Sequence, residues 1–417
     1  MNYKYLTLGI IGITFLFETF IKYLTLKSSD RKIPENVRDI YDEESYGKWL
    51  SYYREKTRLS FLRHVIMYAV TFLMIGFNLY ARIVNLLPVK GVYQEGCAVL
   101  VVDMLVGMFF SIPFDYVNAM RIEQKYGFNR MTKKTFAVDQ IKDFIVGIII
   151  SCGLLSLFIL IHQAMGNWLL LVFSAVMVIL VLAVVVISPV IMRLYNKFEP
   201  LPDGTLKERL YMLLEENGCS VRAIQVTDGS KRSSKANAYF TGLGRTKTIV
   251  LYDTLLEQMS EDEIVAVFAH EMGHNKHKDT LKMYGMNLFN VALFVLFAWL
   301  LVSKGEIYGF FGFTGLNYGF AFILLSAFAS FLSPLLGLLS GRLQRKAEYA
   351  ADGFAAENGY GNELISSLKK LARNSFDCLS PHPLVVRLTY SHPTVSQRIA
   401  AIEKSMEKRG NEDVKGH

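Results

Sequence analysis

The sequence predicts a mainly α protein in which seven membrane-spanning helices carry a small cytoplasmic α+β domain. Of the 417 residues, 52% are hydrophobic and only 20% are charged, whereas an ordinary soluble domain has about 25% charged residues. The mean hydropathy is +0.28. The apolar residues gather in runs of the length, about 20 residues, that a helix needs to cross a bilayer. One polar stretch, 193–283, combines helical and strand patterns instead.

Seven windows are long and apolar enough to be membrane spans. They lie at about 5–25, 65–88, 98–119, 142–164, 167–192, 284–303 and 318–340. The first has no small-residue cleavage site after its apolar run, so we interpret it as a span and not as a signal peptide. Asp103 and Asp115 interrupt the third window, where ionisable residues are costly. Either they lie at an interface or pair with a neighbouring helix, or they line an aqueous cavity.

These windows divide the chain into four parts. An N-terminal membrane region with five spans covers 1–192, and a cytoplasmic domain covers 193–283. A membrane hairpin of two spans occupies 284–340, and a cytoplasmic C-terminal segment occupies 341–417. The sequence gives no signal of oligomeric state.

The distribution of basic residues predicts the orientation. The loops after the first and third spans are rich in Lys and Arg, whereas the loop "HQAMGN" has neither and the loop after the sixth span has only Lys304. By the positive-inside rule, the N-terminus lies outside and the C-terminus is cytoplasmic. Topology thus accounts for the net charge of +8, and we expect the lipid bilayer, and no nucleic acid, as a partner. The four cysteines have no CxxC spacing, so neither a disulfide framework nor a cysteine–zinc site is expected.

The 193–283 segment has the pattern of a small mixed domain. "TLKERLYMLLEENG" has helical spacing and stops at Gly218. "AIQVTDG", "NAYFTGLG" and "TKTIVLYD" predict three short strands, and the last of them is a candidate edge for pairing with an extended peptide. Ser260 and Glu263 form a capping box that begins the next helix.

That helix carries the motif His270-Glu271-x-x-His274. Four-residue spacing places both imidazoles on one helix face, where they can hold the same ion. Catalytic zinc takes three protein ligands and leaves one position for water, and Glu271 stands where a general base for that water is needed. The sequence therefore predicts one Zn²⁺ ion and hydrolysis of peptide bonds. The alternative is a capped surface helix whose histidines are incidental.

The third ligand is predicted from topology. Glu348 and Asp352 are also four residues apart, just after the last span. A short outer loop joins the last two spans, so their other ends meet on the cytoplasmic side. At 1.5 Å per residue, His274 lies about 15 Å before one span and Glu348 about 12 Å after the other. Glu348 is the candidate ligand, and Asp352 the acceptor that orients a ligating histidine.

The other histidines are weaker candidates for the third metal ligand. The longer zinc motif places its third histidine six residues after the second, whereas His277 follows His274 by three. We therefore expect His277 on the solvent side. His64 and His162 adjoin membrane segments and are expected at interfaces.

With these residues in place, the chain resembles the type I CAAX prenyl protease family of integral-membrane zinc endopeptidases. The resemblance covers nearly the whole chain, and six segments carry it in the expected order: KIPENVRDIYDEESYGKWLSYYREKTRLS, RIEQKYGFNRMTKKTFAVDQIKD, NKFEPLPDGTLKERL, SSKANAYFTGLGRTKTIVLYDTLL, RKAEYAADGFA and YSHPTVSQRIAAI. It implies a helical chamber largely enclosed by the membrane, with the zinc centre near its cytoplasmic side. It also implies that Asn237 holds the substrate backbone, and that His392 and Arg398 donate hydrogen bonds to the substrate or to the developing oxyanion.

The expected function is hydrolysis of peptide bonds near the C-terminus of CAAX-type or other membrane-associated substrates, prenylated or not. The expected location is the endoplasmic reticulum membrane in a eukaryote and the inner membrane in a bacterium. One alternative is a membrane-protein quality-control zinc protease without prenyl dependence. A seven-span transporter or receptor is a non-enzyme alternative, but it leaves the two ligand pairs unexplained.

Overall fold

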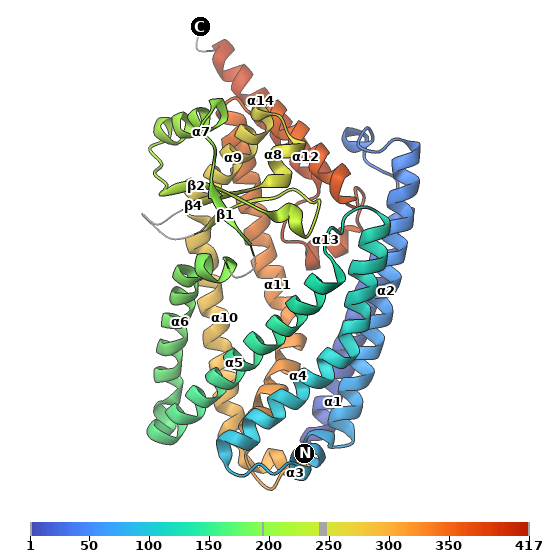
Figure 1. Cartoon of the computed structure of the whole chain (residues 1–417), viewed down its shortest axis with the longest axis vertical. Helices are drawn as coiled ribbons and strands as arrows, with labels where there is room; N and C mark the ends of the chain where they lie inside the picture. Colours follow the sequence, from blue (N-terminus) through green and yellow to red (C-terminus); the bar gives the residue numbers. More distant parts are fainter. Residues whose placement is uncertain (1, 194–195, 242–247, 416–417) are drawn as a thin grey trace.

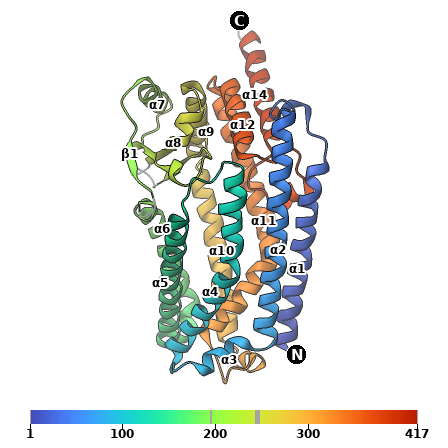
Figure 2. The same cartoon turned by 45° about the vertical axis from the view of Figure 1, so that its right-hand side comes forward.

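The structure is a computed structural model that describes residues 2–193, 196–241 and 248–415. Long helices form an elongated bundle, and a small sheet with shorter helices covers one end of it (Figures 1 and 2). The N-terminus lies at the opposite end of the bundle from the sheet and from the C-terminal helix (Figure 1). The sheet domain therefore lies at the end of the bundle away from the N-terminus.

Within the described residues, six helices are long and apolar enough to cross a membrane. They are α1 (Tyr3–Lys27), α2 (Glu43–Gly76), α4 (Val92–Val117), α5 (Lys133–Met165), α10 (Asp279–Val302) and α11 (Tyr318–Glu357). A shorter apolar stretch, Leu169–Leu180, belongs to α6 (Leu169–Met192). Each predicted window overlaps one of these helices, whereas the count of seven spans stays a prediction.

The second predicted span, 65–88, differs from the structure at both ends. The helix α2 begins much earlier, where Asp42 caps it by accepting a hydrogen bond from Ser45 N at 2.7 Å. It ends at Gly76, because Asn78 adopts a left-handed backbone with φ of 57° and α3 (Leu79–Leu86) starts in a new direction. The apolar pattern continues across this break, so hydropathy alone did not reveal it.

Asp103 and Asp115 both find a partner on a neighbouring helix. Arg63 Nη1 donates to Asp115 Oδ1 at 2.7 Å, so Asp115 pairs with a neighbouring helix. Tyr80 donates to Asp103 Oδ1 at 2.5 Å, and both residues line a cavity of about 320 Å³ between membrane-length helices. Both aspartates therefore pair with a neighbouring helix, and Asp103 also faces a cavity.

Among the described residues, the sheet has four strands in the order β1-β2-β4-β3. They are β1 (Phe198–Pro200), β2 (Ala223–Thr227), β3 (Ala238–Thr241) and β4 (Thr248–Tyr252). The strands β2 and β4 are parallel, and the other two pairs are antiparallel. The prediction that β4 offers a free edge is wrong, because β2 and β3 flank it. The edge strands are β1, which was not predicted, and β3. Residues 242–247, which complete two of the predicted strands, lie outside the described residues.

Helices α7 (Thr205–Glu216), α8 (Asp253–Gln258) and α9 (Glu261–Lys276) pack with this sheet. Gly218, with φ of 62°, ends the predicted helix α7. The predicted capping box is confirmed, with Ser260 N donating to Glu263 Oε2 at 2.9 Å. Buried Leu210, Ile249 and Phe268 belong to the core that joins these helices to the sheet. The core holds α9 in place.

The C-terminal region adds α12 (Gly361–Ser375), α13 (Pro383–Thr389) and α14 (Val395–Lys415). The helix α11 runs for 40 residues without a break at the predicted boundary of 340, so one continuous helix reaches from the bundle into the sheet domain. Short turns of 3₁₀ or π helix complete the described elements: Ser28–Asp30, Glu35–Val37, Asn118–Glu123, Gly166–Trp168, Gly229–Lys231 and Gly305–Phe311.

Candidate metal centre

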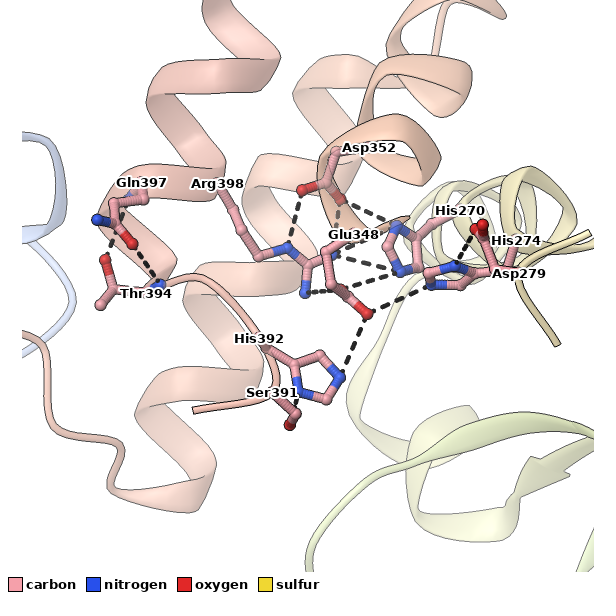
Figure 3. A network of polar contacts seen from close by, with 10 residues as sticks. All are labelled: His270, His274, Asp279, Glu348, Asp352, Ser391, His392, Thr394, Gln397 and Arg398. Carbon is pink, nitrogen blue, oxygen red and sulfur yellow. Dashed lines mark hydrogen bonds and ion pairs between the residues drawn. The ribbon is translucent and has the colours of Figure 1, made fainter. Parts of the chain in front are cut away.

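The site forms where α9 crosses α11. A Cβ atom added to Gly273 would lie 2.7 Å from Ala351 Cα, so the absent side chain permits this close approach. His270 and His274 stand three residues before and one residue after Gly273, and Glu348 and Asp352 stand in the same positions about Ala351. The crossing therefore brings two pairs of four-residue spacing face to face, as Figure 3 shows.

Three of these side chains converge on one point. Ligand atoms of His270, His274 and Glu348 all lie within 4.8 Å of one another, and His270 and Glu348 are buried. Nε2 of His274 is 3.4 Å from Glu348 Oε1, and Nε2 of His270 is 3.6 Å from Glu348 Oε2. The structure thus brings together the three residues that the sequence predicts as metal ligands.

The other ring nitrogen of each histidine faces a carboxylate. Nδ1 of His270 lies 2.9 Å from Oδ1 of the fully buried Asp352, as predicted for an orienting residue. Nδ1 of His274 lies 3.2 Å from Oδ2 of Asp279, which is also buried. When the imidazole is neutral, an acceptor at Nδ1 holds the proton there and leaves the Nε2 lone pair for a metal.

Asp279 was not singled out from the sequence. It begins α10, directly after Lys278, whose left-handed backbone with φ of 55° breaks the helix. Because the chain changes direction there, helical spacing from His274 predicts nothing about Asp279. In the sequence, Asp279 is an acidic residue that precedes the predicted span at 284–303 by five positions.

Arg398 and His392 close the other side of the site. Arg398 donates to both carboxylate oxygens of Asp352 at 2.9 and 2.6 Å, and its Nη1 lies 3.2 Å from Glu348 Oε2. His392 Nε2 lies 3.3 Å from Glu348 Oε1, and its Nδ1 meets Ser391 Oγ at 2.7 Å. The side chain of His392 is 62% exposed, so it is accessible from solvent, whereas that of Arg398 is 12% exposed.

The remaining predicted residues have different environments. Glu271 lies beside His270 on α9; burial raises its pKa, although the charges of His270 and His274 oppose that shift. Asn237 is exposed at the start of the edge strand β3, and its Oδ1 accepts from Ala238 N at 2.9 Å. Among the described residues, no hydrogen bond or ion pair joins Asn237 to the cluster. His277 is exposed, as predicted.

The donor set fits a divalent cation. Glu348 Oε2 is buried and accepts no hydrogen bond within the described part of the chain, although Arg398 Nη1 lies 3.2 Å from it. Burial alone would lower the pKa of His274, but the hydrogen bond and the charge of Glu348 outweigh it and raise that pKa to about 9. A place that stabilises positive charge on imidazole also favours a metal ion. Two imidazoles, one carboxylate and an open position are the ligands of catalytic zinc.

Two family models match the chain in succession. One, described as the CAAX prenyl protease N-terminal region with five membrane helices, matches residues 22–197, and peptidase family M48 matches residues 200–406. CAAX prenyl protease 1 of Saccharomyces cerevisiae is 32% identical over 431 residues, which covers 95% of this chain and 94% of the relative. This chain belongs to the CAAX prenyl protease 1 group of peptidase family M48.

Two further comparisons also match nearly the whole length of this chain. The CAAX prenyl protease 1 homolog of Arabidopsis thaliana is 31% identical and covers 95% of this chain and 96% of the relative. The crystal structure of S. mikatae Ste24p superposes with a TM-score of 0.90 at 29% identity, covering 96% of this chain and 99% of that one. The protein is therefore a multi-pass, membrane-embedded metallopeptidase. The transporter or receptor alternative no longer applies.

Proposed function

We propose that this peptidase uses one Zn²⁺ ion to cleave CAAX-type protein substrates near their C-terminus. The convergence of His270, His274 and Glu348 beside Glu271 carries the proposal. The two imidazoles would bind the ion through Nε2, and Glu348 would bind it through its carboxylate. When bound, Zn²⁺ supplies Lewis-acid polarisation of the scissile carbonyl and makes a nearby water more acidic.

The protein side chains supply the proton transfers and the orientation. Glu271 takes the proton of the attacking water and passes it to the leaving amine. Its raised pKa suits this exchange, because a general base works best when its pKa approaches the working pH. Asp352 and Asp279 hold the two histidines in the required tautomer. His392, exposed beside Glu348, is placed to donate to the developing oxyanion.

The substrate would bind along the edge of β3 that pairs with no other strand among the described residues. An extended peptide can add to an exposed strand edge through main-chain hydrogen bonds. Asn237 stands at the start of this edge and is exposed, which suits its proposed contact with the substrate backbone. Arg398 is held by Asp352 and Glu348, so it would donate to the substrate from a fixed position.

The proposed topology has seven spans around a chamber, with the N-terminus outside and the site cytoplasmic. The separation of the N-terminus from the sheet domain along the bundle supports it (Figure 2). A eukaryotic chain would lie in the endoplasmic reticulum membrane, and a bacterial one in the inner membrane. Gly305→Cys, in a variant without the four native cysteines, should react with an impermeant thiol reagent only from the outer side. Labelling from the cytoplasmic side would overturn this topology.

The direct test of function uses purified protein and matched peptides with and without a farnesyl group. Cleavage near the C-terminus that strengthens with the farnesyl group supports processing of prenylated CAAX substrates. Equal cleavage of both peptides would instead favour the quality-control alternative. Absence of cleavage of either peptide by metal-loaded protein would overturn the proposed endopeptidase.

A further inference from the structure

A cavity of about 520 Å³ opens beside His392 and Arg398, and the mechanism above leaves it unused. The C-terminal half of α12, the loop from Asp377 to Cys378 and the segment from Thr389 to Val395 line it. Its walls include Leu368, Leu371 and Val395. The cavity is thus partly apolar, and the proposed oxyanion donors lie in its lining.

Asp377 is the single carboxylate among the described residues of this lining. Its main chain is fully engaged, since its N donates to Ala372 O at 3.0 Å and its O accepts from Tyr41 Oη at 2.9 Å. Its side chain has no hydrogen bond and no ion pair within the described part of the chain. Asp377 is exposed where it lines the cavity, yet desolvation is the largest cause that raises its pKa to about 6, with Lys235 and Lys56 opposing the shift. The carboxylate therefore remains mostly ionised at neutral pH.

The conformation of the preceding residue, Phe376, fixes the position of Asp377 at the cavity. Phe376 adopts a left-handed backbone with φ of 54°, which is disfavoured for a bulky residue and persists only where its surroundings enforce it. Its ring packs edge-on against Phe128 at 5.1 Å and Tyr52 at 5.7 Å between centroids. Phe376 thus points into an aromatic cluster, while the next residue, Asp377, faces the cavity.

We propose that this cavity is a substrate subsite for a cationic side chain, lysine or arginine, close to the scissile bond. The apolar walls suit the methylene stem of such a side chain, and the unpartnered carboxylate suits its charged head. Asp352 and Glu348 already pair with the Arg398 guanidinium, and Glu123 pairs with Lys56, so a substrate cation competes chiefly with Lys235 for the Asp377 carboxylate. This inference rests on the proposed endopeptidase function and deepens it.

The test uses the purified full-length, metal-loaded protein and a set of peptides that it cleaves. Lysine, norleucine or glutamate is placed in turn at each of the three positions on either side of the scissile bond. At one position, lysine should be preferred to norleucine by about tenfold in kcat/KM, the size expected for one charge-assisted contact. Glutamate should be the poorest of the three there.

Variants identify the residue responsible. In Asp377→Asn the ratio of lysine to norleucine should fall close to one, and in Asp377→Glu it should persist. Asp203→Asn, at an exposed residue paired with Lys207, is the matched control and should keep the full ratio. Because each ratio compares two peptides on the same protein sample, partial loss of folded protein does not alter it. Cleavage without any lysine preference, or a preference that survives Asp377→Asn, would overturn the subsite and leave the proposed endopeptidase standing.

Discussion

Asp279, the first residue of α10, places its Oδ2 3.2 Å from Nδ1 of His274. This contact crosses the break between two helices, so it ties the metal site to the start of a membrane-length helix. Removing the orienting acceptor of a ligating histidine costs about 10- to 100-fold in metal affinity. We expect Asp279→Ala to weaken zinc binding by that factor, measured by titration with a competing chelator.

The control for Asp279 is its neighbour Lys282. Lys282 Nζ lies 2.8 Å from Asp279 Oδ1, but its side chain is 60% exposed. Exposed ion pairs contribute little, so Lys282→Ala should leave the affinity nearly unchanged. Equal affinities in Asp279→Ala and wild type would show that His274 is oriented without Asp279.

Glu271→Gln separates catalysis from metal binding. The amide keeps the size of the side chain but cannot take a proton from water, so hydrolysis should fall by about 10²- to 10⁴-fold. The zinc content should stay at the wild-type level, because Glu271 is not among the converging ligand atoms. Peptide cleavage and metal analysis on the same preparation check both statements. Full activity in this variant would contradict the proposed mechanism.

Glu348→Ala should lose the metal and the activity together. The substitution removes one of the three converging ligands. It also removes the carboxylate that Arg398 and His392 face. Metal content after dialysis against a weak chelator is the measurement. Tight zinc binding in Glu348→Ala would mean that another residue supplies the third ligand.

Sequence spacing predicts those site residues that lie on regular, uninterrupted helices. The pairs His270–His274 and Glu348–Asp352 lie on the uninterrupted helices α9 and α11, and the membrane hairpin predicts that these helices meet. Asp279 lies beyond such a helix, where the left-handed Lys278 redirects the chain. Periodicity is lost at that point, so no local rule relates Asp279 to the site.

The same limit applies to the sheet and to the loops. Strand propensity located β2, β3 and β4, but their order depends on pairing between distant segments, and β4 proved central instead of exposed. The three-residue strand β1, which ends in Pro200, has too short a pattern to be detected. Asp377 follows the left-handed Phe376, whose conformation depends on an aromatic cluster formed by segments far apart in the sequence.

Gly273→Ala should disturb the site without touching a ligand. The new Cβ would lie 2.7 Å from Ala351 Cα, so α9 and α11 would have to move apart. Overpacking of this kind costs about 1–3 kcal/mol, and we expect a lower unfolding temperature together with weaker zinc binding. Gly285→Ala on α10 is the matched control, since no atom lies within 4 Å of its added Cβ. Alanine is favoured over glycine inside a helix, so this control should not be destabilised.

The preference for lysine at the proposed subsite should depend on pH. Protein surroundings raise the pKa of Asp377 from 3.8 to about 6, so about nine-tenths of its carboxylates are ionised at pH 7 and about nine-tenths are protonated at pH 5. A substrate lysine keeps its charge throughout this range. The ratio of kcat/KM between lysine and norleucine peptides should therefore fall as the pH drops through about 6.

Other ionisable groups lie near Asp377 or line the cavity: Lys56, Lys235, Tyr41, Tyr52, Cys378, Tyr390, His392 and Arg398. Of these, His392 has its pKa lowered below 6.5, with desolvation as the largest cause although its side chain is 62% exposed, and it would gain a repelling charge in acid. The variant Asp377→Asn distinguishes the two groups, because it removes one carboxylate and keeps His392. If Asp377 is responsible, the ratio in this variant is low and independent of pH between 5 and 8. A ratio that still falls in acid would assign the titration to His392, and the carboxylate would then not be the group that recognises the lysine.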